Sequence, residues 1–388
     1  MTNEEQFGIR NLSVIIKPTN NCNFNCKPCY ASSGPMNRDV MSGETLENSI
    51  TKISYFNGKG DDNCSSFIWH GGEPLLAGLG FFIDVVKIQK RLRDDGYAFR
   101  NAIQTNGSLI RKETVDFFKE NEFSPSLSLD GPKEINDKTR IYAKARNGSY
   151  STFDDVIRSI DLLKENGIDA GVVTVVNRHN IDCLQEVYDF FKSKGINAKF
   201  NPLFKTGRAK LNYSELCVSE EEYAEATFAF FKAWEKDTQP IHLECFENML
   251  KSYLSNGCYS PECQFMDSCQ RKFISIDRNG DVYPCAEFCG VTEFRYGNIN
   301  SDSLEEILSS PLRDKLYGRS EKISDCQGCE HKGLCYGGCM QRAYAANGDI
   351  MGKDPLCQTF KMFFGYFSKT FLAVEDTKST GGGEKNVK

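Results

Sequence analysis

The sequence lacks several features that would place it in common classes of protein. No apolar run approaches the roughly 20 residues that span a bilayer. The N-terminal stretch MTNEEQFGIR is acidic and has no basic segment followed by an apolar one, so no secretory signal is predicted. Basic residues are not in excess, and a net charge of −6 argues against nucleic acid or an anionic membrane as a partner. We therefore expect a cytoplasmic protein.

Cysteine, by contrast, is abundant, with 17 among 388 residues. In a secreted chain this odd number would indicate disulfides with one spare thiol, whereas in a reducing cytosol the same abundance favours metal ligation. Most of the cysteines fall into two clusters along the sequence. Cys22, Cys26 and Cys29 lie within eight residues of one another, and ten more lie between Cys258 and Cys357.

Strand-like and helix-like segments alternate over the first half of the chain. Apolar, β-branched runs predict strands at 12–19, 65–70, 98–107, 124–131, 169–177 and 197–204. Helical periodicity predicts helices at 42–56, 78–95, 111–121, 152–166 and 180–194, the first of them capped by Ser42. Six βα units in sequence imply a parallel sheet with right-handed crossovers, and this pattern alone leaves a barrel and a doubly wound sheet both open.

The alternation ends near residue 219. Helices are predicted at 219–236 and 243–254, and a hairpin at 272–285 is expected to turn at Asn279-Gly280. The Gly- and Lys-rich end of the chain is typical of disorder. The composition thus divides the chain into an α/β domain over 1–218, a helical bridge over 219–257, a smaller cysteine-rich domain over 258–372 and a disordered tail over 373–388.

The spacing C-x₃-C-x₂-C puts the thiols of Cys22, Cys26 and Cys29 on one loop after the first predicted strand. A structural zinc site normally has four ligands, and no nearby Cys or His completes this set. Three thiolates instead suit a [4Fe–4S] cluster with one iron left open, because four cysteines are the usual closed arrangement. An open iron can bind a substrate or a cofactor directly.

This spacing resembles the signature of radical S-adenosylmethionine (radical SAM) enzymes. In that family the open iron binds S-adenosylmethionine, and one electron from the cluster cleaves it to a 5′-deoxyadenosyl radical. The resemblance implies a partial (β/α)₆ TIM-like barrel. An aromatic residue usually precedes the third cysteine of the signature, whereas this chain has Pro28 there and Tyr30 just after the cysteine.

Three further stretches support the resemblance: HGGEP at 70–74, QTNG at 104–107 and SLDG at 128–131 each follow a predicted strand, where α/β folds hold their ligands. By resemblance, the cofactor-binding residues are Gly71, Gly72, Glu73, Gln104, Thr105, Asn106, Ser128, Asp130 and Arg140. Gly71 and Gly72 would let the backbone approach the methionine amino group, and Arg140 would balance the methionine carboxylate. Each stretch alone is an ordinary turn sequence, so the prediction depends on their order after the cysteine loop.

The C-terminal cysteines resemble the SPASM extension of radical SAM enzymes that modify peptides and proteins. The resemblance assigns two auxiliary [4Fe–4S] clusters, one to Cys263, Cys269, Cys285 and Cys339, the other to Cys326, Cys329, Cys335 and Cys357. Cys258 is an alternative to Cys263 in the first set. Two zinc sites are the competing hypothesis, because C-x₂-C pairs bind zinc equally well. The expected cofactors are therefore three [4Fe–4S] clusters and S-adenosylmethionine.

Three clusters favour a net oxidation, because closed clusters can accept the electron that remains after hydrogen-atom abstraction. The favoured hypothesis is a maturase that installs a side-chain crosslink (C–C, ether or thioether) in a ribosomally made precursor peptide. The alternative is a sulfatase-type maturase that oxidises a protein Cys or Ser to formylglycine. Those enzymes carry Asp directly after the YPC cysteine, where this chain has Ala286 and then Glu287. Neighbouring side chains of an extended segment point oppositely, so Glu287, the candidate base, need not substitute for that Asp.

Either maturase requires an external one-electron donor such as flavodoxin or ferredoxin. The first predicted strand begins near residue 12, which leaves no room for an N-terminal leader-binding domain. A precursor leader is therefore expected to bind the body of the enzyme or a separate leader-binding protein. A third hypothesis is a non-enzymatic iron–sulfur electron carrier, which explains the clusters but not the GGE, QTNG and SLDG series.

Overall fold

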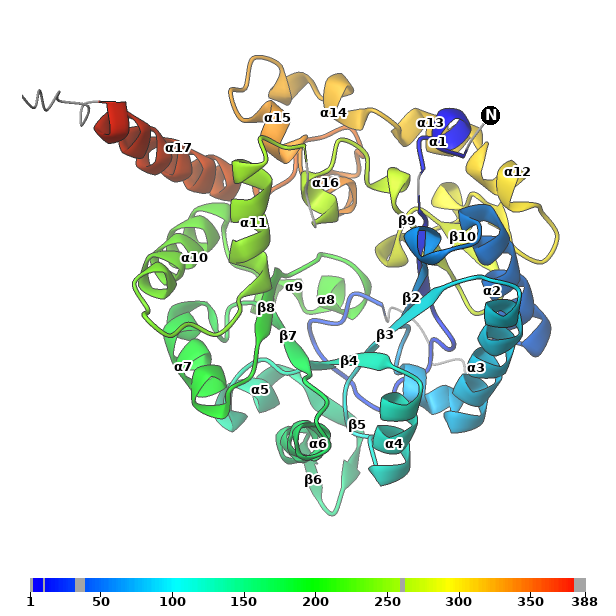
Figure 1. Ribbon diagram of the computed structural model, residues 1–388. Coiled ribbons are helices and arrows are strands. Elements are labelled where there is room, and N and C mark those ends of the chain that lie inside the picture. The colour runs from blue at the N-terminus through cyan, green and yellow to red at the C-terminus, as the bar shows by residue number, and fades with distance from the viewer. Residues whose placement is uncertain (1–2, 10, 32–38, 259–261, 380–388) are drawn as a thin grey trace, which may run out of the picture.

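The computed structural model describes residues 3–9, 11–31, 39–258 and 262–379. Parallel strands lie side by side in the order β1 (Ser13–Ile16), β2 (Ser65–Trp69), β3 (Phe99–Thr105), β4 (Phe123–Ser128), β7 (Gly171–Val176) and β8 (Ala198–Pro202). Between them run α2 (Gly43–Asn57), α3 (Leu79–Asp94), α4 (Lys112–Glu120), α6 (Phe153–Glu165) and α7 (Leu184–Lys194). Figure 1 shows these helices around the outside of the curved sheet. The predicted α/β fold with a partial (β/α)₆ barrel is confirmed.

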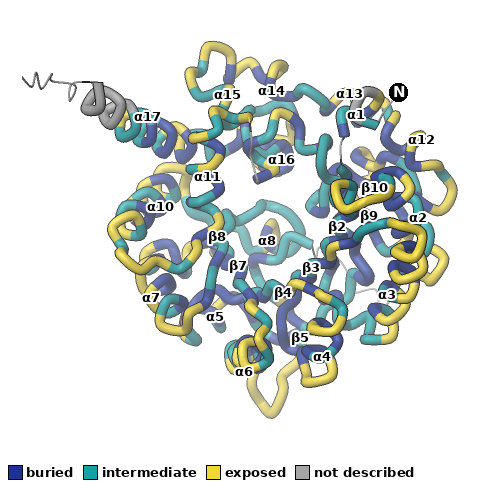
Figure 2. The backbone as a smooth tube through the Cα atoms, viewed as in Figure 1, coloured by how far each residue is buried: buried dark blue, intermediate teal, exposed yellow. Residues whose placement is uncertain are grey.

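The core of the barrel lies between the sheet and this outer layer of helices. Trp69 and Phe67 of β2 and Phe82 of α3 are fully buried there, and Figure 2 shows the exposed residues on the outer faces of the helices. α2 begins as predicted, because the Ser42 hydroxyl accepts a hydrogen bond from Thr45 N at 3.1 Å. None of the described helices is long and apolar enough to cross a membrane.

An unpredicted insertion after β4 supports the first cysteine loop. It consists of α5 (Lys133–Thr139) and a hairpin of β5 (Ile141–Arg146) and β6 (Ser149–Ser151). Asn25 N donates a hydrogen bond to Ile141 O at 2.7 Å. The Phe24 ring packs edge-on against Tyr142 with 4.8 Å between centroids. The hairpin thus anchors the segment between Cys22 and Cys26.

The cysteine-rich half extends the barrel sheet. β9 (Phe273–Ile276) pairs in parallel with β1, and β10 (Asp281–Tyr283) and β11 (Gly297–Asn298) follow antiparallel, which gives a nine-stranded sheet. The predicted hairpin with its turn at Asn279-Gly280 is confirmed. The pairing of β9 with β1 was not predicted.

Three long helices cover the side of the barrel next to β8: α10 (Glu220–Glu235), α11 (Glu244–Leu254) and α17 (Cys357–Ser379). Aromatic rings join them, with Phe231 5.3 Å from Phe246 and 5.2 Å from Phe363 between centroids. The sequence predicted a disordered tail over 373–388, whereas α17 continues to Ser379. Residues 380–388 lie outside the described part. The remaining helices are short: α1 (Asn3–Phe7), α8 (Gly207–Leu211), α9 (Tyr213–Leu216), α12 (Leu304–Leu308), α13 (Pro311–Leu316), α14 (Arg319–Lys322), α15 (Lys332–Cys335) and α16 (Met340–Asn347).

Candidate active site

The first cysteine loop follows β1 at the carboxyl end of the parallel sheet. Burial raises the pKa of Cys22, and the neighbouring thiols of Cys26 and Cys29 raise it further. Burial also raises the pKa of Cys26 to about 12, while the nearby Arg140 guanidinium opposes this rise. The structure thus brings the three thiols together.

The two glycines of HGGEP pack against the cysteine loop. Gly72 N donates to Thr19 O at 3.0 Å, and Glu73 N donates to Asn21 O at 2.8 Å. A Cβ at Gly71, where φ is +126°, would lie 2.4 Å from Thr19 O, and a Cβ at Gly72 would lie 2.1 Å from Asn21 O. The absent side chains therefore allow β2 to approach the loop that carries Cys22.

Glu73 joins two of the predicted motifs. Its side chain is fully buried, and its carboxylate accepts hydrogen bonds from Thr105 Oγ1 (2.7 Å), Asn106 N (2.7 Å) and Leu75 N (3.0 Å). Burial raises the pKa of Glu73 to about 7, although these donors lower it. Asn106 in turn donates from Nδ2 to Asn23 Oδ1 at 2.8 Å. Glu73 thus ties the end of β3 to the cysteine loop, instead of only adding a carboxylate beside the cofactor.

Asp130 and Arg140 form a buried ion pair close to Cys26. Two guanidinium nitrogens of Arg140 each lie 2.9 Å from a carboxylate oxygen of Asp130. Asp130 also accepts a hydrogen bond from Val175 N at 2.8 Å. The charge of Arg140 therefore already has a partner within the protein. Of the other predicted residues, Gln104 donates from Nε2 to Ser128 Oγ at 3.3 Å, which joins the ends of β3 and β4.

A segment after β8 also closes on the cysteine loop, although no residue of it was predicted. Arg208 donates from Nη1 to Cys26 O at 3.1 Å, and Ala209 N donates to Cys29 O at 3.0 Å. A Cβ at Gly207, where φ is +53°, would lie 2.1 Å from Tyr30 O. The sequence signal was the glycine of KTGR directly after the last strand.

The C-terminal cysteines gather around two cavities in the groups that the resemblance implied. One cavity of about 200 Å³ is lined by Cys263, Cys269, Cys285 and Cys339. A narrower one of about 20 Å³ is lined by Cys326, Cys329, Cys335 and Cys357. Of the two alternatives for the fourth position, Cys263 lines this cavity and Cys258 does not, although both side chains are exposed. Four thiols in each group are the donor set of a closed [4Fe–4S] cluster.

A buried hydroxyl beside the larger cysteine-lined cavity also fits a polar occupant. Tyr296 is 7% exposed, and its Oη has no hydrogen-bond partner among the described residues. Burial raises the pKa of Tyr296, and the thiols of Cys269 and Cys285 act in the same direction, so the ring lies near both. Buried hydroxyls are nearly always bonded, and cluster sulfur is an acceptor for such a group.

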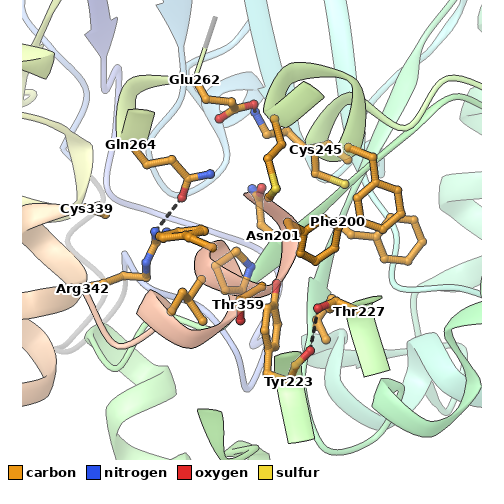
Figure 3. Close-up of a pocket in the computed structure, with 18 of the residues that line it drawn as sticks. Phe200, Asn201, Tyr223, Thr227, Cys245, Glu262, Gln264, Cys339, Arg342 and Thr359 are labelled. Atoms are coloured by element: carbon orange, nitrogen blue, oxygen red, sulfur yellow. Dashed lines mark hydrogen bonds and ion pairs between the residues drawn. The ribbon is translucent and has the colours of Figure 1, made fainter. Parts of the chain in front are cut away.

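A cavity of about 220 Å³ lies between β8 and the helices α10, α11 and α17. Figure 3 shows the rings of Phe200 and Tyr223 on its wall, with the Arg342 side chain directed at Gln264. The Arg342–Gln264 hydrogen bond is 2.6 Å long. An adjoining cavity of about 300 Å³ shares Tyr223 and Arg342 and includes Lys205. The two cavities therefore adjoin each other at Tyr223 and Arg342.

Glu287 lines both the 220 Å³ cavity and the 200 Å³ cavity of the first auxiliary cysteine group. Burial raises the pKa of Glu287 to about 7, while the Lys17 ammonium opposes the rise. Ala286, Glu287 and Phe288 form a 3₁₀ turn, not an extended strand, and Ala286 is buried. The expectation from alternating strand geometry therefore does not hold, and the carboxylate is accessible from the cavity.

Comparison with known proteins defines the class. Residues 16–191 match the family model of the radical SAM superfamily, and residues 263–330 match the SPASM model, described as an iron–sulfur cluster-binding domain. The chain is therefore a radical SAM protein with a SPASM domain. Its cofactors are S-adenosylmethionine and [4Fe–4S] clusters, for which the described residues offer three thiol groups.

Full-length relatives define the family more closely. The chain is 30% identical to the cysteine-type anaerobic sulfatase-maturating enzyme of Clostridium perfringens over 371 residues, which cover 92% of this chain and 96% of the relative. It is also 30% identical to the serine-type enzyme of Bacteroides thetaiotaomicron, over 91% of this chain and 88% of that one. The solved structure of native anSMEcpe with bound AdoMet superposes with a TM-score of 0.82 at 27% identity, covering 94% and 99% of the two chains. The chain belongs to the family of anaerobic sulfatase-maturating enzymes.

Proposed function

We propose that this protein is a sulfatase-type maturase, which oxidises a Cys or Ser side chain of a protein substrate to formylglycine. The observation that carries the proposal is the similarity to enzymes of this name over more than nine-tenths of the chain. A solved structure of native anSMEcpe with AdoMet and the Cp18Cys peptide, 27% identical with a TM-score of 0.79, supports a peptide segment as the group bound. The crosslinking maturase favoured by the sequence is the less well supported hypothesis.

The residues present suit the cofactors of this reaction. Cys22, Cys26 and Cys29 would hold the cluster with the open iron, and the two C-terminal cysteine groups would hold the auxiliary clusters. When bound, these cofactors and S-adenosylmethionine supply the radical that removes a hydrogen atom from the substrate carbon and an acceptor for the remaining electron. The ends of β3 and β4, with Gln104, Ser128 and Asp130, and the Arg140 side chain paired with Asp130 would position the cofactor beside the cysteine loop.

Oxidation of a Ser side chain to an aldehyde removes two hydrogens, as one hydrogen atom, one proton and one electron. From Cys the same removal gives a thioaldehyde, which water hydrolyses to the aldehyde with release of H₂S. The proton requires an acceptor near the substrate carbon. In our proposal Glu287 is this acceptor, because its carboxylate lines both the substrate-sized cavity and the first auxiliary cavity. It would replace the Asp that other members of the family carry one residue earlier, where this chain has Ala286.

The crosslinking alternative has one observation in its favour, which is the absence of that Asp at Ala286. The chain is 18% identical to Streptococcus suis SuiB in its structure bound to the precursor peptide SuiA, with a TM-score of 0.65. This likeness shows a shared fold only. A separate leader-binding protein belongs to this alternative. An external one-electron donor such as flavodoxin or ferredoxin, and a cytoplasmic location, belong to both.

The deciding experiment incubates the reduced, cluster-loaded enzyme with S-adenosylmethionine and a sulfatase-derived peptide containing Cys or Ser. We expect an aldehyde that reacts with a hydrazide probe and is detected by mass spectrometry. A Glu287→Gln variant should form deoxyadenosine but about 10²-fold less aldehyde, whereas Glu287→Asp should retain part of the yield. Loss of two hydrogens without a hydrazide-reactive group would indicate a crosslink and would overturn the proposal.

A further inference from the structure

Arg319, the first residue of α14, is a buried cation at the centre of the cysteine-rich half. It is only 5% exposed. Its guanidinium donates hydrogen bonds to the carbonyl oxygens of four residues: Ile350 (2.5 Å), Gly352 (2.5 Å), Gly338 (3.2 Å) and Gly337 (3.3 Å). Carbonyl groups satisfy the donors but do not neutralise the charge.

The position of Arg319 connects the two auxiliary cysteine groups. Its side chain lines the cavity of the first group together with Cys269 and Cys339. Arg319 also lies near the second group, because a Cβ at Gly337 would be 3.5 Å from Arg319 Nη1 and 3.7 Å from Cys326 Sγ, with the Ile323 Cδ1 methyl filling the same place at 2.3 Å.

The loop to which Arg319 donates two of these hydrogen bonds connects the two cysteine groups. Gly337 and Gly338 stand between Cys335, which lines the second cavity, and Cys339, which lines the first. The hydrogen bonds to these glycine carbonyls therefore fix the guanidinium relative to both cysteine groups at once.

No carboxylate in the described parts of the chain forms an ion pair with Arg319. Asp354 lies near enough to interact electrostatically with Arg319, but its carboxylate forms a buried ion pair with Arg342 at 2.5 Å. A buried guanidinium without a counter-charge is costly, and Arg is seldom buried unless it is paired. A cluster held by four thiolates carries net negative charge, and one-electron reduction adds to that charge.

We propose that Arg319 is a positioning residue that the two auxiliary clusters share as their counter-charge. This role rests on the cluster sites of the proposed function and goes beyond it. A fixed cation favours the reduced state of each cluster, and it therefore raises both reduction potentials. Because the same charge faces both sites, it also stabilises an electron on either cluster and so eases its transfer from one to the other.

The test compares reduction potentials in the full-length chain with reconstituted clusters. Cys22, Cys26 and Cys29 are replaced by Ala so that only the auxiliary clusters are titrated by EPR-monitored reduction. The variants are Arg319→Gln, Arg319→Lys and the matched control Arg313→Gln. Arg313 is 3% exposed and also donates to carbonyls, those of Phe7, Leu308 and Gln270, but it lines neither of the two cysteine cavities.

We expect Arg319→Gln to shift both potentials in the negative direction, with Arg319→Lys and Arg313→Gln close to the parent. Parent potentials in Arg319→Gln at full iron content would overturn the proposal. If Arg319→Gln loses iron, the iron content of Arg319→Lys is the deciding measurement. Parent-level iron in Arg319→Lys supports a required positive charge. Equal loss of iron in both variants shows that the guanidinium only holds the loop in place, and it overturns the proposal. Failure of the parent itself to bind auxiliary clusters would instead count against the proposed function.

Discussion

Replacing Gly72 by Ala tests whether the packing of HGGEP controls the first cysteine loop. The new Cβ would lie 2.1 Å from Asn21 O and 2.6 Å from Asn21 C. Carbon and oxygen atoms normally approach no closer than about 3.3 Å, so the loop must move by about 1 Å. Asn21 precedes Cys22 directly, and a misplacement of about 1 Å in a reactive site can cost about 10²-fold in rate. We therefore expect the yield of 5′-deoxyadenosine from S-adenosylmethionine to fall by about that factor.

The assay measures deoxyadenosine by chromatography after anaerobic reduction, with the iron content of each variant determined in parallel. Gly80→Ala is the matched control, because Gly80 lies in the first turn of α3 and a Cβ there would have nothing within 4 Å. Alanine also favours a helix over glycine, so this variant should be as stable as the parent and as active. Parent-level deoxyadenosine from Gly72→Ala would refute the packing argument.

Four further predictions concern the cluster thiols, the buried carboxylate and the bound iron. Cys22→Ala should abolish cleavage of S-adenosylmethionine, and an unchanged deoxyadenosine yield would contradict the assignment of this ligand. Glu73→Gln should lower the free energy of unfolding by about 1–3 kcal/mol in denaturant titrations, because an amide nitrogen then faces a backbone N–H. Burial raises the pKa of Glu73 from 4.5 to about 7, so the folded state binds the proton more tightly. The contribution of this proton to the free energy of unfolding is full below about pH 4.5 and is lost as the pH rises to about 7. The same pH dependence of stability in Glu73→Gln would count against this assignment to Glu73. Removal of iron by a chelator should lower the melting temperature in fluorimetry, because clusters bind the folded chain, and an equal midpoint would argue against bound clusters.

Much of the fold was predictable because its signals are local. The strands of the barrel are short apolar runs, and the cap at Ser42 depends on residues three positions apart. The β5–β6 hairpin was missed although its turn, Asn147-Gly148, has the positive φ values (50° and 77°) that Asn-Gly typically adopts. The pairing of β9 with β1 was not predictable, since the order of strands distant in sequence depends on tertiary packing.

The site shows the same division between local and non-local information. The resemblance grouped the C-terminal cysteines as the two cavities now group them, because spacing carries that information. The backbone at Glu287 was expected to be extended, whereas the structure has a 3₁₀ turn there. Arg319 and Arg342 were not singled out, because their burial follows from packing that the local sequence does not reveal.

The parallel contact between β1 and β9 has a consequence for how the chain is made. Until residue 273 has left the ribosome, the first strand of the barrel keeps one side unpaired, and an unpaired strand edge readily recruits other chains. The cysteine-rich half is thus a structural complement of the barrel and not an attachment to it. We expect a chain shortened to residues 1–218 to associate in solution instead of folding as a stable domain.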